Sequence, residues 1–114
     1  MIATILALAL AALQFYILVL EMFFWDTPRG RAAFGTTESF ASETRVLAAN
    51  QGLYNGFLSI GILVGLWMSP VLTIYMLACI LVAGIYGGLT SSRKIIFVQA
   101  VPAAVTLLAF WMGI

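Results

Sequence analysis

Four polar side chains stand together in one otherwise apolar stretch of the chain: Asn50, Gln51, Tyr54 and Asn55. Residues four apart in a helix share a face, so the pairs 50/54 and 51/55 would form one broad polar surface. Arg45 stands just before them with a permanent positive charge. Polar groups inside a membrane span are costly, which favours a polar pocket for a small molecule. The alternative is that each amide only joins two helices, at about 0.6 kcal/mol per contact.

Glu21 is an acidic residue near the end of the first apolar segment, and it would share a helical face with Gln14, seven residues earlier. A carboxyl group in this position can act as an acid, a base or a proton carrier. It can equally be an interfacial group that reaches the lipid head groups or pairs with Arg45 or Arg93. The residues alone leave these readings open.

Tyr86 precedes Arg93 by seven residues, so a helix that reached Arg93 would place both side chains on one face. Gly87, Gly88 and the two serines at 91 and 92 argue against such a continuation. Arg93 can contribute a charge to a site, and it can also serve only to orient the chain in a membrane. A role for Arg93 in a site would come in addition to its role in orienting the chain.

The residue types exclude several kinds of chemistry. The chain has no histidine, which rules out Ser-His and Cys-His catalysis within one chain. Its single cysteine, Cys79, allows neither an intrachain disulfide nor a cysteine-based metal site, and we expect no metal. A net charge of +1 provides no field for nucleic acid, which is not an expected partner.

Composition indicates an integral membrane protein. Hydrophobic residues make up 64% of the chain and charged residues 8%, against about 25% charged in an ordinary soluble domain. Such an excess of apolar surface must face lipid or another subunit. Membrane lipid is therefore an expected partner.

Four apolar segments are long enough to cross a bilayer as helices, since about 20 residues suffice. The sequence predicts them at 2–25, 44–67, 71–90 and 95–113, so that residues 1–114 form a single all-α transmembrane domain, a four-helix bundle. The polar segment 26–43 is the one long connection, and Ser39 or Ser42 is expected to cap the second helix. Met68-Ser69-Pro70 and residues 91–94 are expected to be tight turns.

The basic residues fix an orientation. All five lie in or beside the first and third connections, at Arg29, Arg31, Arg45, Arg93 and Lys94. By the positive-inside rule, loops 26–43 and 91–94 are cytoplasmic and both termini lie outside, in a multi-pass protein of the cell membrane.

Glycines recur at four-residue spacing in the second and third segments, at Gly52/Gly56, Gly61/Gly65 and Gly84/Gly88. Such pairs let helix backbones approach closely, and we expect them to serve packing within one subunit or in an oligomer.

Short motifs resemble a known superfamily. The run Arg45-Val46-Leu47-Ala48-Ala49-Asn50-Gln51 resembles the R-V-x-x-A-N-Q opening of helix 2 in some members of the membrane-associated eicosanoid and glutathione metabolism superfamily. Gly84-Ile85-Tyr86 followed by Arg93 fits a second element of that superfamily. Over its whole length the chain also resembles a bacterial four-helix membrane family of unknown function, through Glu21-Met22-Phe23, Asn50-Gln51-Gly52-Leu53-Tyr54-Asn55-Gly56-Phe57 and Ala83-Gly84-Ile85-Tyr86-Gly87.

The superfamily resemblance implies a homotrimer with a pocket between neighbouring subunits, open to the cytoplasmic face. It implies glutathione as the molecule in that pocket and Arg93 as the residue that stabilises its thiolate. The sequence departs from the usual glutathione-binding pattern on helix 2, approximately R-A-x-x-N-x-x-E. The matching positions are Ala48, Ala49, Gly52 and Asn55, so the arginine, asparagine and glutamate are replaced. The cofactor therefore stays open.

Three functional hypotheses follow. In the first, a trimer binds a small amphipathic or anionic molecule at the cytoplasmic leaflet, and thiol-dependent transferase or isomerase chemistry is an open question, as is whether the protein is an enzyme. The ligand-binding residues would be Arg45, Asn50, Gln51, Tyr54, Asn55 and Tyr86, with Arg93 and Glu21 as catalytic candidates. The second is a proton-coupled transporter of the small multidrug resistance type that uses Glu21, although the charge bias and the long first loop argue against it. The third is a structural or accessory membrane subunit.

Overall fold

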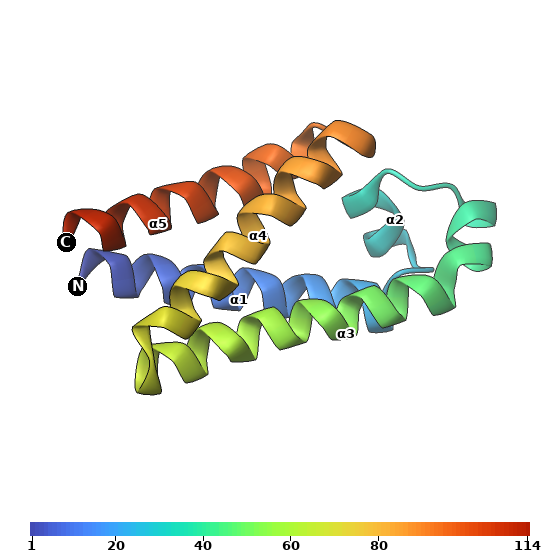
Figure 1. Ribbon diagram of the computed structural model, residues 1–114. Coiled ribbons are helices and arrows are strands. Elements are labelled where there is room, and N and C mark those ends of the chain that lie inside the picture. Colours follow the sequence, from blue (N-terminus) through green and yellow to red (C-terminus); the bar gives the residue numbers. More distant parts are fainter. The chain divides into compact units, whose positions relative to one another are not determined.

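The computed structural model in Figure 1 describes residues 1–114 and contains helices and no strands. In chain order these are α1 (Ile2–Phe23), α2 (Pro28–Phe34), α3 (Glu38–Met68), α4 (Pro70–Thr90), a π-helical segment (Ile96–Ala100) and α5 (Val101–Met112). The predicted all-α class is confirmed. The chain forms two compact units, one of Leu13–Phe57 and one of Met1–Ala12 with Leu58–Ile114.

The first connection is more helical than predicted. Segment 26–43 contains α2, and α3 begins at Glu38, six residues before the expected start. Thr37 caps α3 in place of Ser39 or Ser42, because its Oγ1 accepts a hydrogen bond of 3.1 Å from the Phe40 N–H. Glu38 then stands in the first turn, where a negative charge suits the helix dipole. A helix outside the hydrocarbon region can be polar, so low hydropathy alone does not indicate a loop.

Two helices are long and apolar enough to cross a membrane, α1 with 22 residues and α4 with 21. Only 33% and 28% of their most apolar windows are buried inside the chain, so most of this apolar surface faces outward. A shorter apolar helix covers Ile96–Met112. By length and composition, α1 and α4 are candidate membrane spans. The four spans and the outward termini remain predictions.

In the unit that contains α4, the glycine pairs bring helices of the same chain together. A Cβ at Gly65 would lie 2.6 Å from the Thr73 nitrogen, just after the tight turn where Ser69 caps α4 through the Leu72 N–H. A Cβ at Gly84 would lie 2.7 Å from the Ala100 nitrogen. Figure 1 shows α4 running beside the π-helical segment and α5. These glycines therefore serve contacts within the chain.

The C-terminal helix changes register before Pro102. Proline has no N–H to continue the α-helical ladder, and the Val101 N–H bonds to the Ile96 carbonyl with π-helical spacing. After this point α5 runs regularly to Met112, and the Ile114 carbonyl accepts 2.8 Å hydrogen bonds from the Ile2 N–H and the Met1 amino group. The two ends of the chain thus lie together, which requires both to be on one side of any membrane that the chain crosses.

We expect Gly84→Ala to lower the free energy of unfolding by about 1–3 kcal/mol, because the added methyl would meet the Ala100 backbone, which cannot move aside alone. Gly87→Ala is the matched control on the same helix, since its methyl would meet only side-chain atoms of Ile95, at 3.3 Å and beyond. Its effect should stay within about 1 kcal/mol, the size of the helix-propensity difference. Thermal unfolding in neutral detergent measures both, and equal effects would contradict the packing described.

Candidate functional site

The unit Leu13–Phe57 contains a buried carboxyl group. Glu21, in the last turn of α1, is 2% exposed. Its Oε2 accepts a hydrogen bond of 2.9 Å from Gln51 Nε2, and its Oε1 accepts one of 2.5 Å from Asn55 Nδ2. Both oxygens are thus held by amide donors of α3. We call these three residues the amide–carboxylate cluster.

Two glycines of α3 make the cluster possible. A Cβ at Gly52 would lie 3.1 Å from the Cβ of Glu21 and 2.7 Å from Met22 Cγ. At Gly56, it would lie 2.5 Å from Leu18 Cδ1. The missing side chains let α3 approach α1 closely enough for Gln51 to reach the carboxylate. The glycine pair Gly52/Gly56 therefore positions the cluster.

The broad polar surface predicted on α3 divides in two. Gln51, which is itself exposed, and the half-buried Asn55 donate to Glu21 of α1. Asn50 and Tyr54 are exposed and lie about 100° away around the helix. Tyr54 is 59% exposed and packs edge-on against Phe57, with ring centroids 5.6 Å apart. Two of the four polar residues thus contact Glu21. A binding role for the other two stays a prediction.

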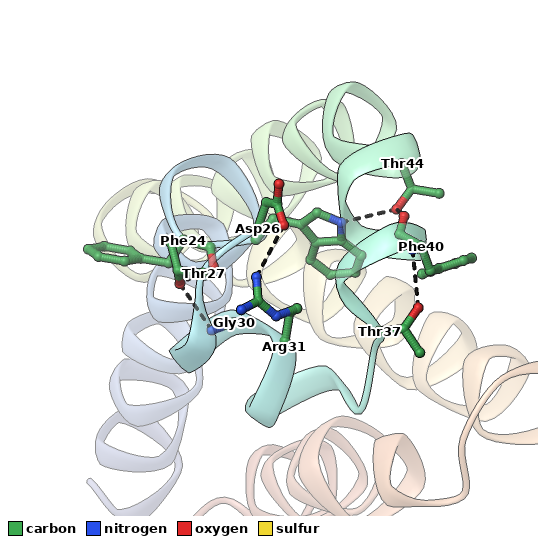
Figure 2. Close-up of polar contacts among 9 residues, drawn as sticks. Phe24, Asp26, Thr27, Gly30, Arg31, Thr37, Phe40 and Thr44 are labelled. Carbon is green, nitrogen blue, oxygen red and sulfur yellow. Dashed lines mark hydrogen bonds and ion pairs between the residues drawn. The ribbon is translucent and has the colours of Figure 1, made fainter.

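No arginine accompanies the carboxylate within this unit. Glu21 bonds to two amides, and Arg45, one of the two arginines offered as a possible partner, is exposed. The ion pair of this unit lies in the first connection, where Arg31 Nη1 is 3.2 Å from Asp26 Oδ1. Figure 2 shows these two side chains meeting beside α2. The side chains that donate hydrogen bonds to the Glu21 carboxyl group are therefore uncharged amides.

The first connection ties the helices together just beyond the cluster. The Trp25 indole N–H donates a 3.1 Å hydrogen bond to Thr44 Oγ1, and that hydroxyl donates to the Phe40 carbonyl at 2.7 Å. Thr44 and Phe40 appear at the start of α3 in Figure 2. The Trp25 ring packs on Phe34 of α2, with centroids 4.9 Å apart. These contacts hold the end of α1 against the start of α3.

The turn into α2 is equally tight. Thr27 Oγ1 donates to the Phe24 carbonyl at 2.6 Å and accepts from the Gly30 N–H at 3.3 Å, as Figure 2 shows. A Cβ at Gly30 would lie 1.9 Å from the Phe24 carbonyl oxygen, so only glycine fits there. Residues 24–37 thus form a compact, hydrogen-bonded segment and not an open loop.

Tyr86 and Arg93 belong to the other unit. Helix α4 ends at Thr90, where the N–H groups of Ser91 and Ser92 both bond to the Gly87 carbonyl. The helix therefore does not reach Arg93, and the seven-residue spacing does not place the two side chains on one helical face. Tyr86 is 69% exposed and Arg93 is exposed in the turn. Their part in a site stays a prediction.

Comparison with known proteins places the chain in a family. It matches the family described as "Protein of unknown function (DUF1304)" over residues 8–111. The chain belongs to the DUF1304 family. It is 35% identical over 115 residues to "Uncharacterized protein YpaA" of Lactococcus lactis subsp. lactis (strain IL1403), which covers 95% of this chain and 96% of that protein. No solved structure matches the chain.

The expected membership of a family of unknown function is confirmed, whereas the resemblance to the glutathione superfamily has no support from these matches. The residues matched to DUF1304 include the complete amide–carboxylate cluster. They also include Gln14, which is 0% exposed and whose Nε2 and Oε1 make no hydrogen bond. The spacing of Gln14 and Glu21 in the sequence indicated a shared face. It did not indicate that Glu21 would have hydrogen-bond partners and that Gln14 would have none.

Proposed function

We propose that this DUF1304 protein is an integral membrane protein that binds a small amphipathic molecule at the cytoplasmic leaflet, with the amide–carboxylate cluster as the polar centre of the site. One observation carries the proposal: Glu21 is buried at the end of an apolar helix and held by two amides from α3. Ionisable groups inside membrane helices are costly and mark binding sites or transport pathways by default.

The surface of the chain supports a membrane location. Large apolar side chains are exposed on both candidate spans, among them Ile5 at 58%, Val82 at 66% and Leu89 at 77%. A soluble monomer rarely exposes apolar patches of more than a few hundred Å². Lipid covers such a surface without the need for a partner protein. The basic residues near 29–45 and 93–94 favour the cytoplasmic side for the end of α1 that carries Glu21.

The hydrogen-bonding capacity left in the cluster favours a donor ligand. Each carboxylate oxygen has two lone-pair positions, and Glu21 uses one on each oxygen. The carbonyl oxygens of Gln51 and Asn55 add further acceptors, because their amide nitrogens already donate to Glu21. Each amide also keeps one N–H donor, but free acceptor positions outnumber free donors in the cluster. A primary ammonium head group, which only donates, is the matching ligand chemistry.

The free acceptor positions of the cluster disfavour an anionic ligand, which the first hypothesis from the sequence included. An anion such as glutathione would meet acceptors and a carboxylate at the cluster, so it would need arginines to offset the repulsion. Arg45 is exposed and bonds to none of the cluster residues. We therefore propose an amphipathic amine ahead of glutathione or another anion.

A proton-coupled transporter is the second candidate, favoured by the burial of a single carboxyl residue in α1. Such a transporter would exchange its cationic substrate for a proton at Glu21. The two candidates share the cluster and differ in turnover. Proteoliposomes loaded with a pH-sensitive dye would acidify or alkalise on addition of substrate only in the second case.

The proposal predicts that purified protein in neutral detergent retains n-dodecylamine in native mass spectrometry, and that Glu21→Gln loses most of this binding. Glutamine keeps the size of the side chain and removes the charge and two acceptor positions. Glu43→Gln is the matched control, since it removes an exposed carboxylate from the same unit.

Two further amphiphiles separate the contributions to binding. Dodecyltrimethylammonium carries the charge without an N–H donor, and dodecanoate reverses the charge, so both should bind less well than the amine. Equal retention of n-dodecylamine by wild type and Glu21→Gln, or a preference for dodecanoate, would contradict the proposal. The same spectra report the oligomeric state and so test the predicted trimer.

A further inference from the structure

We infer that Gln14 is a second recognition group of the same site, so that the ligand is an amphipathic amine with another polar group about 10 Å from its ammonium. This inference rests on the proposed function and deepens it. The distance follows from seven residues along α1 at about 1.5 Å per residue. The same spacing leaves Gln14 and Glu21 only about 20° apart around the helix.

The bonding state of Gln14 carries the inference. Its side chain is 0% exposed, yet neither its Nε2 nor its Oε1 has a hydrogen-bond partner. A buried amide without partners loses its hydration and gains nothing in return, and native proteins keep few such groups. An apolar residue at this position would make the folded state more stable. The neighbouring buried polar residue on this face, Glu21, has both oxygens satisfied.

The contacts around the cluster indicate the direction in which the site extends. Beyond Glu21, the hydrogen bond from Trp25 to Thr44 ties α1 to α3, and Gly30 packs against the Phe24 carbonyl. On the other side of Glu21, the buried face of α1 next offers Ile17 and then Gln14. A ligand head group at Glu21 therefore has one further polar partner on this face, and it lies deeper in the apolar segment.

The chemistry of an amide specifies the second group. Gln14 has two donors and an acceptor available, so a hydroxyl, which can both donate and accept, satisfies it. An alkyl chain between the two polar groups would pass Ile17. Amino-octanol has about the required length, and octylamine is the matched molecule without the second polar group.

Native mass spectrometry in neutral detergent tests the inference with these two probes. Wild type should bind amino-octanol about tenfold more tightly than octylamine, which is one net hydrogen bond between protein and ligand. Gln14→Met, which keeps the volume, should bind both amines equally and with the wild-type affinity for octylamine. Tyr16→Phe removes an exposed hydroxyl from α1 and should leave the tenfold preference intact.

Thermal unfolding supplies the second readout. Gln14→Met should unfold at the same temperature as wild type or a higher one, because it removes a buried group without partners. A loss of stability in Gln14→Met, or a change of its oligomeric mass, would assign Gln14 to packing and overturn the inference. Octylamine binding that depends on Glu21, with no preference for amino-octanol, would overturn the inference while the proposed function stands. Binding of neither amine by wild type would overturn both.

Discussion

Replacing both amides of the cluster, as in Gln51→Leu with Asn55→Leu, is expected to lower the free energy of unfolding by about 3–5 kcal/mol, as for a buried charge that loses its partner. Glu21 would stay 2% exposed in α1 while losing the two donors that now hold its oxygens. Hydrogen bonds to a charged group contribute about 1.5–3 kcal/mol each, so two of them account for this loss. Thermal or dodecyl-sulfate unfolding of the detergent-solubilised protein measures the effect.

The chain contains its own matched control for this experiment. Asn50→Leu with Tyr54→Leu makes the same number of changes at the same spacing, one residue earlier on α3, at exposed positions. Its effect should stay within about 1 kcal/mol, since exposed substitutions rarely exceed about 0.5 kcal/mol each.

A third variant tests the coupling. If Glu21→Leu is added to the two amide replacements, most of the lost stability should return, because no buried carboxyl group is left without donors. Failure of this rescue would mean that the amides stabilise the α1–α3 contact independently of Glu21. In that case the cluster would be ordinary helix-packing contacts and the proposed function would lose its basis.

The sequence predicted the helical class because a chain so rich in apolar residues in long segments has few other structures available. It also predicted the turn at Ser69, where a cap residue is followed by proline at the first helical position. The first connection was wrong in part, since α2 and the first six residues of α3 occupy a segment predicted as loop. Thr37 fulfils the cap role there, and several hydroxyl residues in 36–42 made that choice ambiguous from sequence.

The sequence identified the residues of the candidate site but did not predict that the amides of α3 would bond to Glu21. Helical spacing brought Gln51 and Asn55 to one face correctly, but it could not tell which neighbouring helix that face meets. That information lies in Gly52 and Gly56, whose close approach to α1 is a tertiary contact. The only protein partners that the sequence offered for Glu21 were Arg45 and Arg93, on the basis of charge. Two neutral amides hold it because they stand on the helix that the glycines bring close.

The predicted orientation places each connection wholly on one side of the membrane, because the five basic residues lie only in or beside two connections. The structure decides where to place the reporters. Gly30 is unsuitable, since a side chain there would meet the Phe24 carbonyl, and Ser69 caps α4. Ala32, exposed on α2, and Val71, 78% exposed at the start of α4, are free of such contacts.

In a Cys79→Ala background, Val71→Cys should react with a membrane-impermeant maleimide on intact cells, and Ala32→Cys should react only after the membrane is opened. Replacing Cys79, which is partly exposed, removes the background thiol. In the sequence, Ala32 precedes α3 and Val71 follows it. The 31 residues of α3 are enough to span about 46 Å, more than the roughly 30 Å of a hydrocarbon core. The reverse labelling would place Glu21 at the outer leaflet, so the ligand would have to come from outside the cell. Equal labelling of both sites on intact cells would mean that α3 does not cross the membrane, and the predicted four-span topology would be wrong.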